Sequence, residues 1–385
     1  MRKNLSNSPG IYIHIPFCQH KCGYCDFYSI TNLSLQKDFV QALLREIDLR
    51  AKHIINSQPF DTIYLGGGTP SLLSAEETER IFTRLKMRFS FTSDCEITIE
   101  VNPGTITSGK LRLYKEQGIN RLSIGVQSFR QKELQFLERI HSVEETNETF
   151  NMAREAGFGN IGIDLIYALP GQTIESWEYT LRKAVALQPE HISAYNLTFE
   201  EGTPFYSRLQ RGELNKAAEE KEKILFLQTE TILRRGGYLH YEVSNYARSV
   251  TFISRHNYKY WLHVPYLGFG PAAHSFWQNE RFANVRGLDS YLAMLGNDKL
   301  PLAFKERIDD EKRRFENIFL QLRTYEGLSL QNFEQEFKRS FAQVYKRQIN
   351  HLLDEGLAEL NNNYFRLTSK GMMVCDAILP QFVTY

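Results

Sequence analysis

The segment GIYIHIPFCQHKCGYCDFY, residues 10–28, joins a short apolar run to three cysteines. Isoleucine and tyrosine dominate the first part, which is typical of a buried strand. Cys18, Cys22 and Cys25 follow with the spacing C-x3-C-x2-C. Thiols gathered directly after a strand predict a metal-binding loop at the end of that strand.

Further strand-like runs follow, separated by amphipathic helical segments. The helical segments carry apolar residues at spacings of three and four, as in residues 39–51 and 111–118, where Gly118 ends the pattern. This alternation predicts an α/β fold with a parallel sheet, open or closed toward a barrel. The predicted strands span residues 10–17, 62–70, 96–103, 121–129, 161–170 and 191–200.

Chemically distinctive residues stand near the carboxyl ends of these strands, where α/β folds gather their ligands. They are Cys18, the run Gly66-Gly67-Gly68-Thr69-Pro70, Glu100, Asn102, Gln127 and Asp164. Because the carboxyl ends of parallel strands share one edge of the sheet, we expect a single functional site there.

The later part of the chain changes character twice. The alternation ends near Gly202, and a charged helix is expected at about residues 215–235, followed by aromatic-rich stretches. From about Pro301 the pattern predicts helix, helix, a hairpin turning at residues 361–363, and a final helix, which is a winged-helix-like α+β arrangement. We expect a partial barrel at residues 1–205, a barrel extension at 206–300 and a C-terminal domain at 301–385.

The charge balance argues against nucleic acid as a partner. The chain has 46 Lys and Arg against 45 Asp and Glu. In residues 325–385 six basic residues face seven acidic ones, whereas a DNA-reading winged helix would be basic. The sequence also shows no signal peptide and no run of about 18 apolar residues that would span a membrane. We expect a cytoplasmic protein, not integral to a membrane, with reduced thiols.

Three clustered thiols favour an iron-sulfur cluster over zinc. A structural zinc site needs four protein ligands, and although His20 lies between two of the cysteines, no second Cys/His pair follows at zinc-ribbon distance. An iron-sulfur cube held by three thiolates leaves one iron free to bind a small molecule. Cys95 and Cys375 are expected to be small core residues.

The motif C-x3-C-x2-C, with Tyr24 before its last cysteine, resembles that of the radical S-adenosylmethionine (SAM) superfamily. The resemblance implies a partial (β/α)6 TIM-like barrel and a [4Fe-4S] cluster on the three cysteines. SAM would chelate the open iron, and reduction of the cluster would cleave SAM to a 5′-deoxyadenosyl radical. The run Gly67-Gly68-Thr69 resembles the glycine motif of the superfamily, whose backbone approaches the SAM ammonium.

Other residues are expected around SAM on the same resemblance. Glu100 and Asp164 would bind ribose hydroxyls or the amino group, although a salt bridge across the barrel is the alternative. Gln127 is expected to contact SAM as well. Arg139, expected within a charged helix, either binds the SAM carboxylate through two N–H groups or is a solvated surface residue. Tyr12 either packs on the adenosyl group or belongs to the core.

A set of longer runs resembles one family within this superfamily, which contains the oxygen-independent coproporphyrinogen III oxidase and the heme chaperone HemW. The runs are YIHIPFC, IYLGGGTPSLL, ITIEVNP, RLSIGVQSF and DLIYALPGQT. Three features favour the heme-binding branch. Phe27 stands where the oxidase has a fourth cysteine, only 17 residues precede Cys18, and residues 256–261 match H-N-x-x-Y-W.

The resemblance implies that His256 binds heme, with Tyr260 and Trp261 packing on the porphyrin. His274 is a second candidate ligand. On this interpretation the partners are heme and heme-accepting proteins, with a homodimer possible. The alternative function is the oxidase, in which the adenosyl radical abstracts hydrogen from propionate side chains and carbon dioxide is lost.

Overall fold

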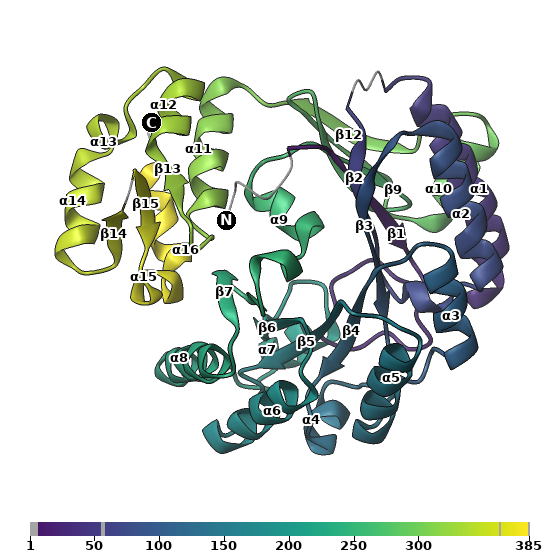
Figure 1. Cartoon of the computed structure of the whole chain (residues 1–385), viewed down its shortest axis with the longest axis horizontal. Helices are drawn as coiled ribbons and strands as arrows, with labels where there is room; N and C mark the ends of the chain where they lie inside the picture. The colour runs from purple at the N-terminus through teal and green to yellow at the C-terminus, as the bar shows by residue number, and fades with distance from the viewer. Residues whose placement is uncertain (1–6, 55–57, 362, 384–385) are drawn as a thin grey trace.

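The structure, a computed structural model, describes residues 7–54, 58–361 and 363–383. Its centre is a curved sheet whose strands β1 to β6 are parallel and lie in sequence order (Figure 1). These strands are β1 (Gly10–Ile15), β2 (Phe60–Gly67), β3 (Phe91–Val101), β4 (Arg121–Gln127), β5 (Ile161–Tyr167) and β6 (His191–Asn196). The six predicted strands are confirmed, and β3 begins five residues earlier than its apolar run suggested.

Further strands extend this sheet at both ends to twelve strands. A parallel strand β9 pairs with β1, and antiparallel strands continue outward, so β12 and β7 are the two edges and the barrel stays open. The added strands are β7 (Leu239–Glu242), β8 (Asn245–Ala247), β9 (Tyr266–Phe269), β10 (His274–Trp277), β11 (Glu280–Asn284) and β12 (Leu302–Arg307).

Helices cover the outer face of the parallel strands (Figure 1). The isoleucines of β1, at positions 11, 13 and 15, are fully buried in this layer, while Tyr12 and His14 point to the inside of the curve. In the described part of residues 7–300 the helices are α1 (Gln36–Ala51), α2 (Ala75–Arg88), α3 (Ser108–Glu116), α4 (Gln131–Phe136), α5 (Val143–Glu155), α6 (Ile174–Leu187), α7 (Pro204–Gln210), α8 (Glu219–Arg235), α9 (Arg255–Trp261) and α10 (Leu288–Gly296), of which α9 lies at the amino end of the strands and not on the outer face.

The C-terminal part has the predicted order of helices and hairpin and its own apolar core. Residue 362 of the predicted hairpin turn lies outside the described residues, as do residues 1–6 of the N-terminal segment. The elements are α11 (Asp310–Gln321), β13 (Leu328–Ser329), α12 (Leu330–Phe337), α13 (Phe341–Val344), α14 (Lys346–Asp354), β14 (Ala358–Asn361), β15 (Tyr364–Leu367), α15 (Ser369–Met373) and α16 (Cys375–Ile378).

Specific contacts join this part to the barrel. Val243 donates its backbone N–H to the carbonyl of Arg323 at 3.0 Å, and Tyr325 donates to that of Tyr241 at 3.1 Å. Phe226 of α8 enters the C-terminal core. The limits of the three expected parts, at residues 205 and 300, stay a prediction.

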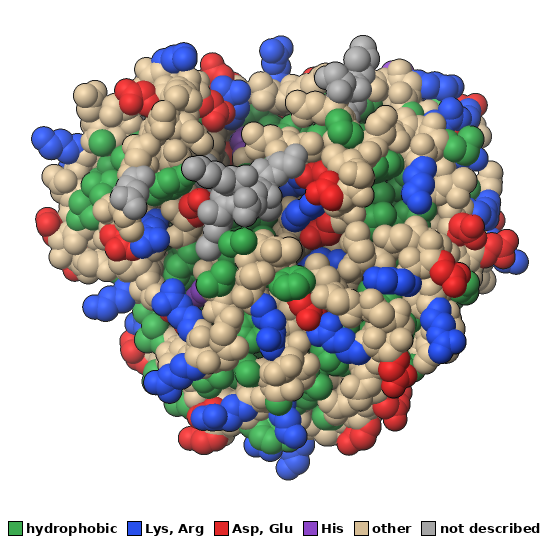
Figure 2. Space-filling model, in the orientation of Figure 1, with side chains coloured by type: hydrophobic (Ala, Val, Ile, Leu, Met, Phe, Trp, Pro, Cys, Tyr) green, Lys and Arg blue, Asp and Glu red, His purple; other side chains and the backbone are tan. Residues whose placement is uncertain are grey.

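The surface and the helices add two observations. Basic and acidic side chains are interspersed over the face shown in Figure 2. In the part of the chain that the structure describes, every helix is too short or too polar to cross a membrane.

Candidate functional site

Two turns at the carboxyl edge of the sheet form the base of the site. The loop after β1 carries the cysteines, and the glycine turn after β2 is fastened to it: Gly68 donates its N–H to the Ile15 carbonyl at 2.8 Å, and Thr69 donates to that of Phe17 at 2.7 Å. A Cβ on Gly68 would lie 2.6 Å from the Phe17 carbonyl oxygen, and Gly67 has a φ of +108°. Glycine is therefore required at both positions to shape the cysteine loop.

The three thiols of this loop are free, and their charges interact with one another. Cys18 and Cys22 are buried and Cys25 is half-buried. Burial raises the pKa of Cys22, and it raises that of Cys25 to about 11; the charge of the neighbouring cysteines adds to both shifts. Across residues 7–54, 58–361 and 363–383, no three His, Cys, Asp or Glu side chains stand at metal-ligand spacing. The donor set itself, three thiols from one loop, is the set that a cluster with one open iron requires.

The nearest charged partner of His20 is Glu138 and not a thiol. Its Nε2 lies 3.9 Å from a carboxylate oxygen of Glu138, and its side chain is about half exposed. The same carboxylate accepts the backbone N–H of Gly23 at 2.9 Å. Glu138 therefore holds the middle of the cysteine loop against the segment after α4.

A chain of polar side chains leads from Cys18 to Cys22 across the strand ends. Thr69 directs its hydroxyl at the Cys18 sulfur over 3.6 Å, and Asn102 donates to the Thr69 hydroxyl at 2.9 Å. The Arg139 guanidinium donates to the Asn102 carbonyl oxygen at 2.6 Å and lies 3.9 Å from the Cys22 sulfur. One hydroxyl and one cation thus direct donors at the sulfurs of Cys18 and Cys22, and Asn102 holds the two donors in place; such donors stabilise negative charge on sulfur.

Arg139 is placed differently from the expectation that it lies in a charged helix. It follows the end of α4 in the loop before α5, and its guanidinium also donates to the Gly125 carbonyl at 3.0 Å. A Cβ on Gly125 would lie 3.0 to 3.2 Å from polar atoms of Asn102, Gln127 and Arg139. The structure therefore brings Gln127 and Arg139 together, and Arg139 is not a solvated surface residue.

Glu100 and Asp164 lie inside the barrel below this edge. Glu100 accepts the Tyr64 hydroxyl at 2.8 Å and the Gly67 N–H at 3.1 Å, and Asp164 accepts the Ser123 hydroxyl at 3.1 Å. Burial raises the pKa of Asp164 and raises that of Glu100 to about 7. Neither carboxylate forms a close ion pair with any described residue, although the charge of the buried Arg121 guanidinium lowers the pKa of both. The roles of Glu100 and Asp164 stay a prediction.

Tyr12 lies in the interior of the barrel, six residues before Cys18, with its ring beside those of Tyr64 and His256. Its hydroxyl is 3.1 Å from Nδ1 of His14, whose Nε2 is 2.7 Å from the carbonyl oxygen of Tyr28. Because a carbonyl only accepts, Nε2 of His14 carries the proton and Nδ1 accepts from Tyr12. Burial lowers the pKa of His14 to about 4, so the ring is neutral. These two hydrogen bonds connect β1 to the segment that follows the cysteines.

His256 lies at the opposite, amino end of the strands and is not brought to the cysteine loop. It is in α9, 1% exposed, with Nδ1 2.8 Å from the Thr62 hydroxyl and Nε2 2.9 Å from the Tyr260 hydroxyl. Burial lowers the pKa of His256 to about 3. Neither ring nitrogen is free in this arrangement. His274, the second heme candidate, is exposed on β10 beside the ring of Phe304, with ring centres 5.9 Å apart.

Sequence reasoning missed several residues that complete the carboxyl-edge site. Asn102 stood among the strand-end residues but was not singled out, although it links Thr69 to Arg139. Gly125 and Glu138 gave no signal, because the first looks like an ordinary strand residue and the second like a surface charge. Their roles depend on contacts between different segments: Gly125 lies against Asn102 and Arg139, and Glu138 bonds to Gly23, 115 residues away in sequence.

Comparison with known proteins agrees with this geometry. Residues 12–184 match the Radical SAM superfamily, and residues 308–374 match the HemN C-terminal domain. The chain is 34% identical to the heme chaperone HemW of Bacillus subtilis, covering 97% of this chain and 98% of that protein. It is also 34% identical to that of Haemophilus influenzae, covering 97% of each. The structure of the coproporphyrinogen III oxidase HemN from Escherichia coli, a radical SAM enzyme, aligns with a TM-score of 0.85 and 26% identity, covering 99% of this chain and 92% of that one.

Proposed function

Because this chain belongs to the HemW family of heme chaperones within the radical SAM superfamily, we propose that it binds heme and delivers it to heme-accepting proteins. The observation that carries this proposal is full-length similarity to relatives of that name, at 34% identity over 97% of the chain. Residue 27 supports it, since Phe27 stands where the oxidase is expected to carry a further cysteine. Cytoplasmic location and homodimer formation belong to the same proposal.

The carboxyl-edge site would hold a [4Fe-4S] cluster and SAM. Cys18, Cys22 and Cys25 would supply the three thiolates, and the open iron would supply a chelation point and one-electron chemistry when the cluster is bound. Arg139, whose buried Nε has no partner within the described residues, offers a donor to a carboxylate, and Glu100 and Asp164 offer acceptors to hydroxyl or ammonium groups. The predicted SAM residues Tyr12, Gly67, Gly68, Thr69 and Gln127 line the same end of the barrel or its interior.

The second candidate function is radical decarboxylation of coproporphyrinogen. The TM-score of 0.85 with the oxidase structure favours it, because the two proteins share the whole fold. A shared fold leaves the chemistry open, since function depends on the residues at the site. On this alternative the same thiols and carboxylates would serve turnover instead of heme transfer.

Two parallel assays decide between the proposals. The anaerobically reconstituted protein, with SAM and a reductant, is incubated with coproporphyrinogen III, and the purified protein is titrated with hemin. We expect saturable hemin binding and no release of carbon dioxide. Stoichiometric decarboxylation would make the oxidase the function, and absence of hemin binding would end the chaperone proposal.

A further inference from the structure

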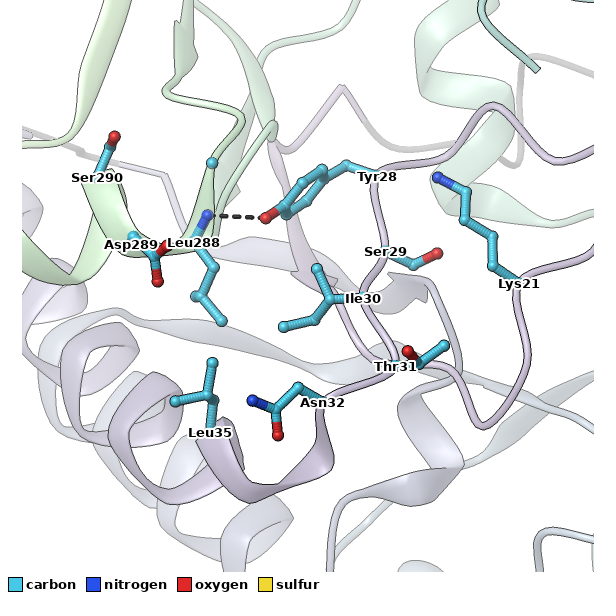
Figure 3. A pocket seen from close by; sticks show the side chains of 11 residues that line it. Lys21, Tyr28, Ser29, Ile30, Thr31, Asn32, Leu35, Leu288, Asp289 and Ser290 are labelled. Carbon is cyan, nitrogen blue, oxygen red and sulfur yellow. Dashed lines mark hydrogen bonds between the residues drawn. The ribbon is translucent and has the colours of Figure 1, made fainter. Parts of the chain in front are cut away.

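The surface pocket between residues 28–35 and the start of α10 is formed by packing between these two segments (Figure 3). The side chains of Ile30, Leu35 and Leu288 point toward one another there. Leu288 also donates its backbone N–H to the Tyr28 hydroxyl at 2.8 Å. These contacts hold the segment after the cysteines against α10, whereas an unusual group of buried charges lies inside the barrel.

Arg121 is a buried cation in the interior of the barrel. It is the first residue of β4 and is 1% exposed, and its Nε and Nη1 have no hydrogen-bond partner within the described residues. A Cβ on Gly162 of β5 would lie 3.1 Å from Nη2 of Arg121, so the guanidinium occupies the space that a side chain at position 162 would fill. A charge buried in this way is costly unless an opposite charge lies nearby.

Two carboxylates lie next to Arg121 on the neighbouring strands. Glu100 of β3 pairs in register with Ser123, which is two residues beyond Arg121 and on the same face of β4. Asp164 of β5 is two residues beyond Gly162 and accepts the Ser123 hydroxyl at 3.1 Å. Arg121 therefore lies inside the same curve of the sheet as both carboxylates, one residue pair closer to the amino ends of the strands.

The charge of Arg121 opposes the effect of burial on both carboxylates. Burial raises the pKa of Asp164 and raises that of Glu100 to about 7, while the Arg121 guanidinium lowers the pKa of each. The charge of Asp164 also raises the pKa of Glu100. Near neutral pH the ionised and protonated forms of Glu100 are therefore in balance, and a neighbouring charge decides which of them predominates.

The ionisable groups of the surrounding elements do not supply the same charge. Burial raises the pKa of four tyrosines that interact with the carboxylates, so all four are neutral near neutral pH. They are Tyr12 of β1, Tyr64 of β2, Tyr195 of β6 and Tyr260 of α9. The rings of His191 and His256 are neutral as well, because burial lowers the pKa of each and the charge of Arg121 contributes. Arg139 acts on Asp164 from the carboxyl edge, where it is already bonded to Asn102.

We propose that Arg121 is a positioning residue, whose charge keeps Glu100 and Asp164 in the ionised form that accepts hydrogen bonds from hydroxyl and ammonium groups of the ligand. Two carboxylates against one guanidinium leave this part of the interior with an excess of negative charge, which favours a cation such as SAM. The inference rests on the proposed SAM site. It adds a buried residue that acts on the ligand through the two carboxylates.

The first test follows Glu100 in the SAM-free protein. Thermal denaturation of each protein and of its Glu100→Gln counterpart is compared from pH 4.5 to about pH 9, and the pH at which the difference levels off reports the pKa of Glu100 in the fold. For the wild-type protein we expect levelling off at about pH 7. For Arg121→Met we expect it about one pH unit higher, because the cation that favours the ionised form has been removed.

Two further variants show whether the charge itself is responsible. Arg121→Lys keeps a buried cation at this position and should level off close to the wild-type value. Arg130→Met is the control for losing an arginine: Arg130 is exposed after β4, where its guanidinium stacks on Tyr179, and its removal should leave the pH dependence unchanged.

The second test measures SAM binding directly. Protein with the reconstituted cluster is titrated with SAM in the absence of a reductant, so that SAM is not cleaved. At pH 7 Arg121→Met should bind SAM about tenfold more weakly than the wild-type protein, which corresponds to about one unit of pKa. The two affinities should converge by about pH 9, where both carboxylates are ionised in either protein. A merely structural role would weaken binding by the same factor at every pH.

Asp164→Asn keeps the comparison possible if Arg121→Met alone does not fold. The double variant Arg121→Met with Asp164→Asn loses one buried charge of each sign, so it avoids an uncompensated charge. The levelling off assigned to Glu100 should occur at a higher pH in the double variant than in Asp164→Asn alone.

The outcomes separate this inference from the function on which it rests. Wild-type protein that holds a cluster but does not bind SAM would end the proposed SAM site. SAM binding by the wild-type protein, with equal levelling off in the proteins with and without Arg121, would overturn the role of Arg121 while leaving the SAM site in place. Equal weakening of SAM binding at every pH in Arg121→Met would also overturn it.

Discussion

Polar side chains gather at both ends of the barrel, but those at the carboxyl end surround the cysteine loop and those at the amino end fasten α9 to the strands. At the carboxyl end, the half-buried Asn102 and Arg139 form a chain of hydrogen bonds beside the buried thiols of Cys18 and Cys22. At the amino end, α9 closes the strands: Glu96 accepts the backbone N–H of His256 at 3.1 Å, and Lys259 forms an ion pair with Asp61 at 2.7 Å with both side chains at most 4% exposed. The difference lies in what supplies the partners: at the amino end α9 provides them, whereas at the carboxyl end Thr69 and Arg139 direct donors at free thiols.

The largest effect is expected from removing a proposed cluster ligand. Cys22→Ser should lower iron and acid-labile sulfide after anaerobic reconstitution by more than about tenfold, because a three-thiolate cluster has no spare protein ligand. Cys95→Ser is the matched control, since Cys95 is also buried but lies on β3 away from the loop. Equal iron content in the two variants would contradict the placement of the cluster at the carboxyl end.

The amino end should respond in stability and not in cluster content. Lys259→Met leaves the buried Asp61 carboxylate without its partner, which costs about 3 to 5 kcal/mol. We expect urea denaturation to show this loss while iron per folded chain stays at the wild-type value. The double variant with Asp61→Leu should recover part of the stability, because replacing both charges by apolar groups removes the unpaired carboxylate. Loss of iron in folded Lys259→Met protein would show that the two ends are coupled.

The glycine turn gives a smaller effect that belongs to the carboxyl end. In Gly68→Ala the new methyl group meets the Phe17 carbonyl oxygen at 2.6 Å, and overpacking of this kind costs about 1 to 3 kcal/mol. The displaced turn should also reduce cluster content. Gly109→Ala is the control: no atom lies within 4 Å of its Cβ position, and it sits in helix α3, so it should be neutral or slightly stabilising. Full cluster content in Gly68→Ala would show that the loop does not need this contact.

Glu100 gives the carboxyl end a pH dependence. Burial raises the pKa of Glu100 in the folded protein from 4.5 to about 7. Below pH 4.5 the carboxyl is protonated in both the folded and the unfolded chain, so it does not change the stability there. Between pH 4.5 and 7 the unfolded chain loses this proton first, which destabilises the wild-type fold as pH rises. Glu100→Gln removes that loss, so its stability relative to the wild-type protein should increase over this range and level off above it. A constant difference in thermal denaturation from pH 4.5 to 8 would contradict the assignment.

The sequence predicts the six parallel strands and the three thiols because both depend on local patterns: apolar runs of period two, and a spacing within one loop. It does not predict Asn102 between Thr69 and Arg139, or Gly125 as the residue that makes room for them, because these contacts join separate strands. His256 shows the reverse problem. Its neighbouring aromatics are visible in the sequence, but only the packing of α9 on β2 reveals that both ring nitrogens are already bonded.

The smallest effect is expected at His256, where the expectation from the sequence and the geometry differ most. Ligation of heme iron by this ring would require its bond to Thr62 or Tyr260 to break and α9 to move away from the strands. We therefore expect His256→Gln to lower stability by about 1 to 2 kcal/mol through the lost hydrogen bonds, and to change hemin affinity by less than about threefold. Hemin titration and urea denaturation of the same preparation measure both effects. A large loss of hemin affinity with unchanged stability would make His256 the iron ligand and would mean that α9 opens when heme binds.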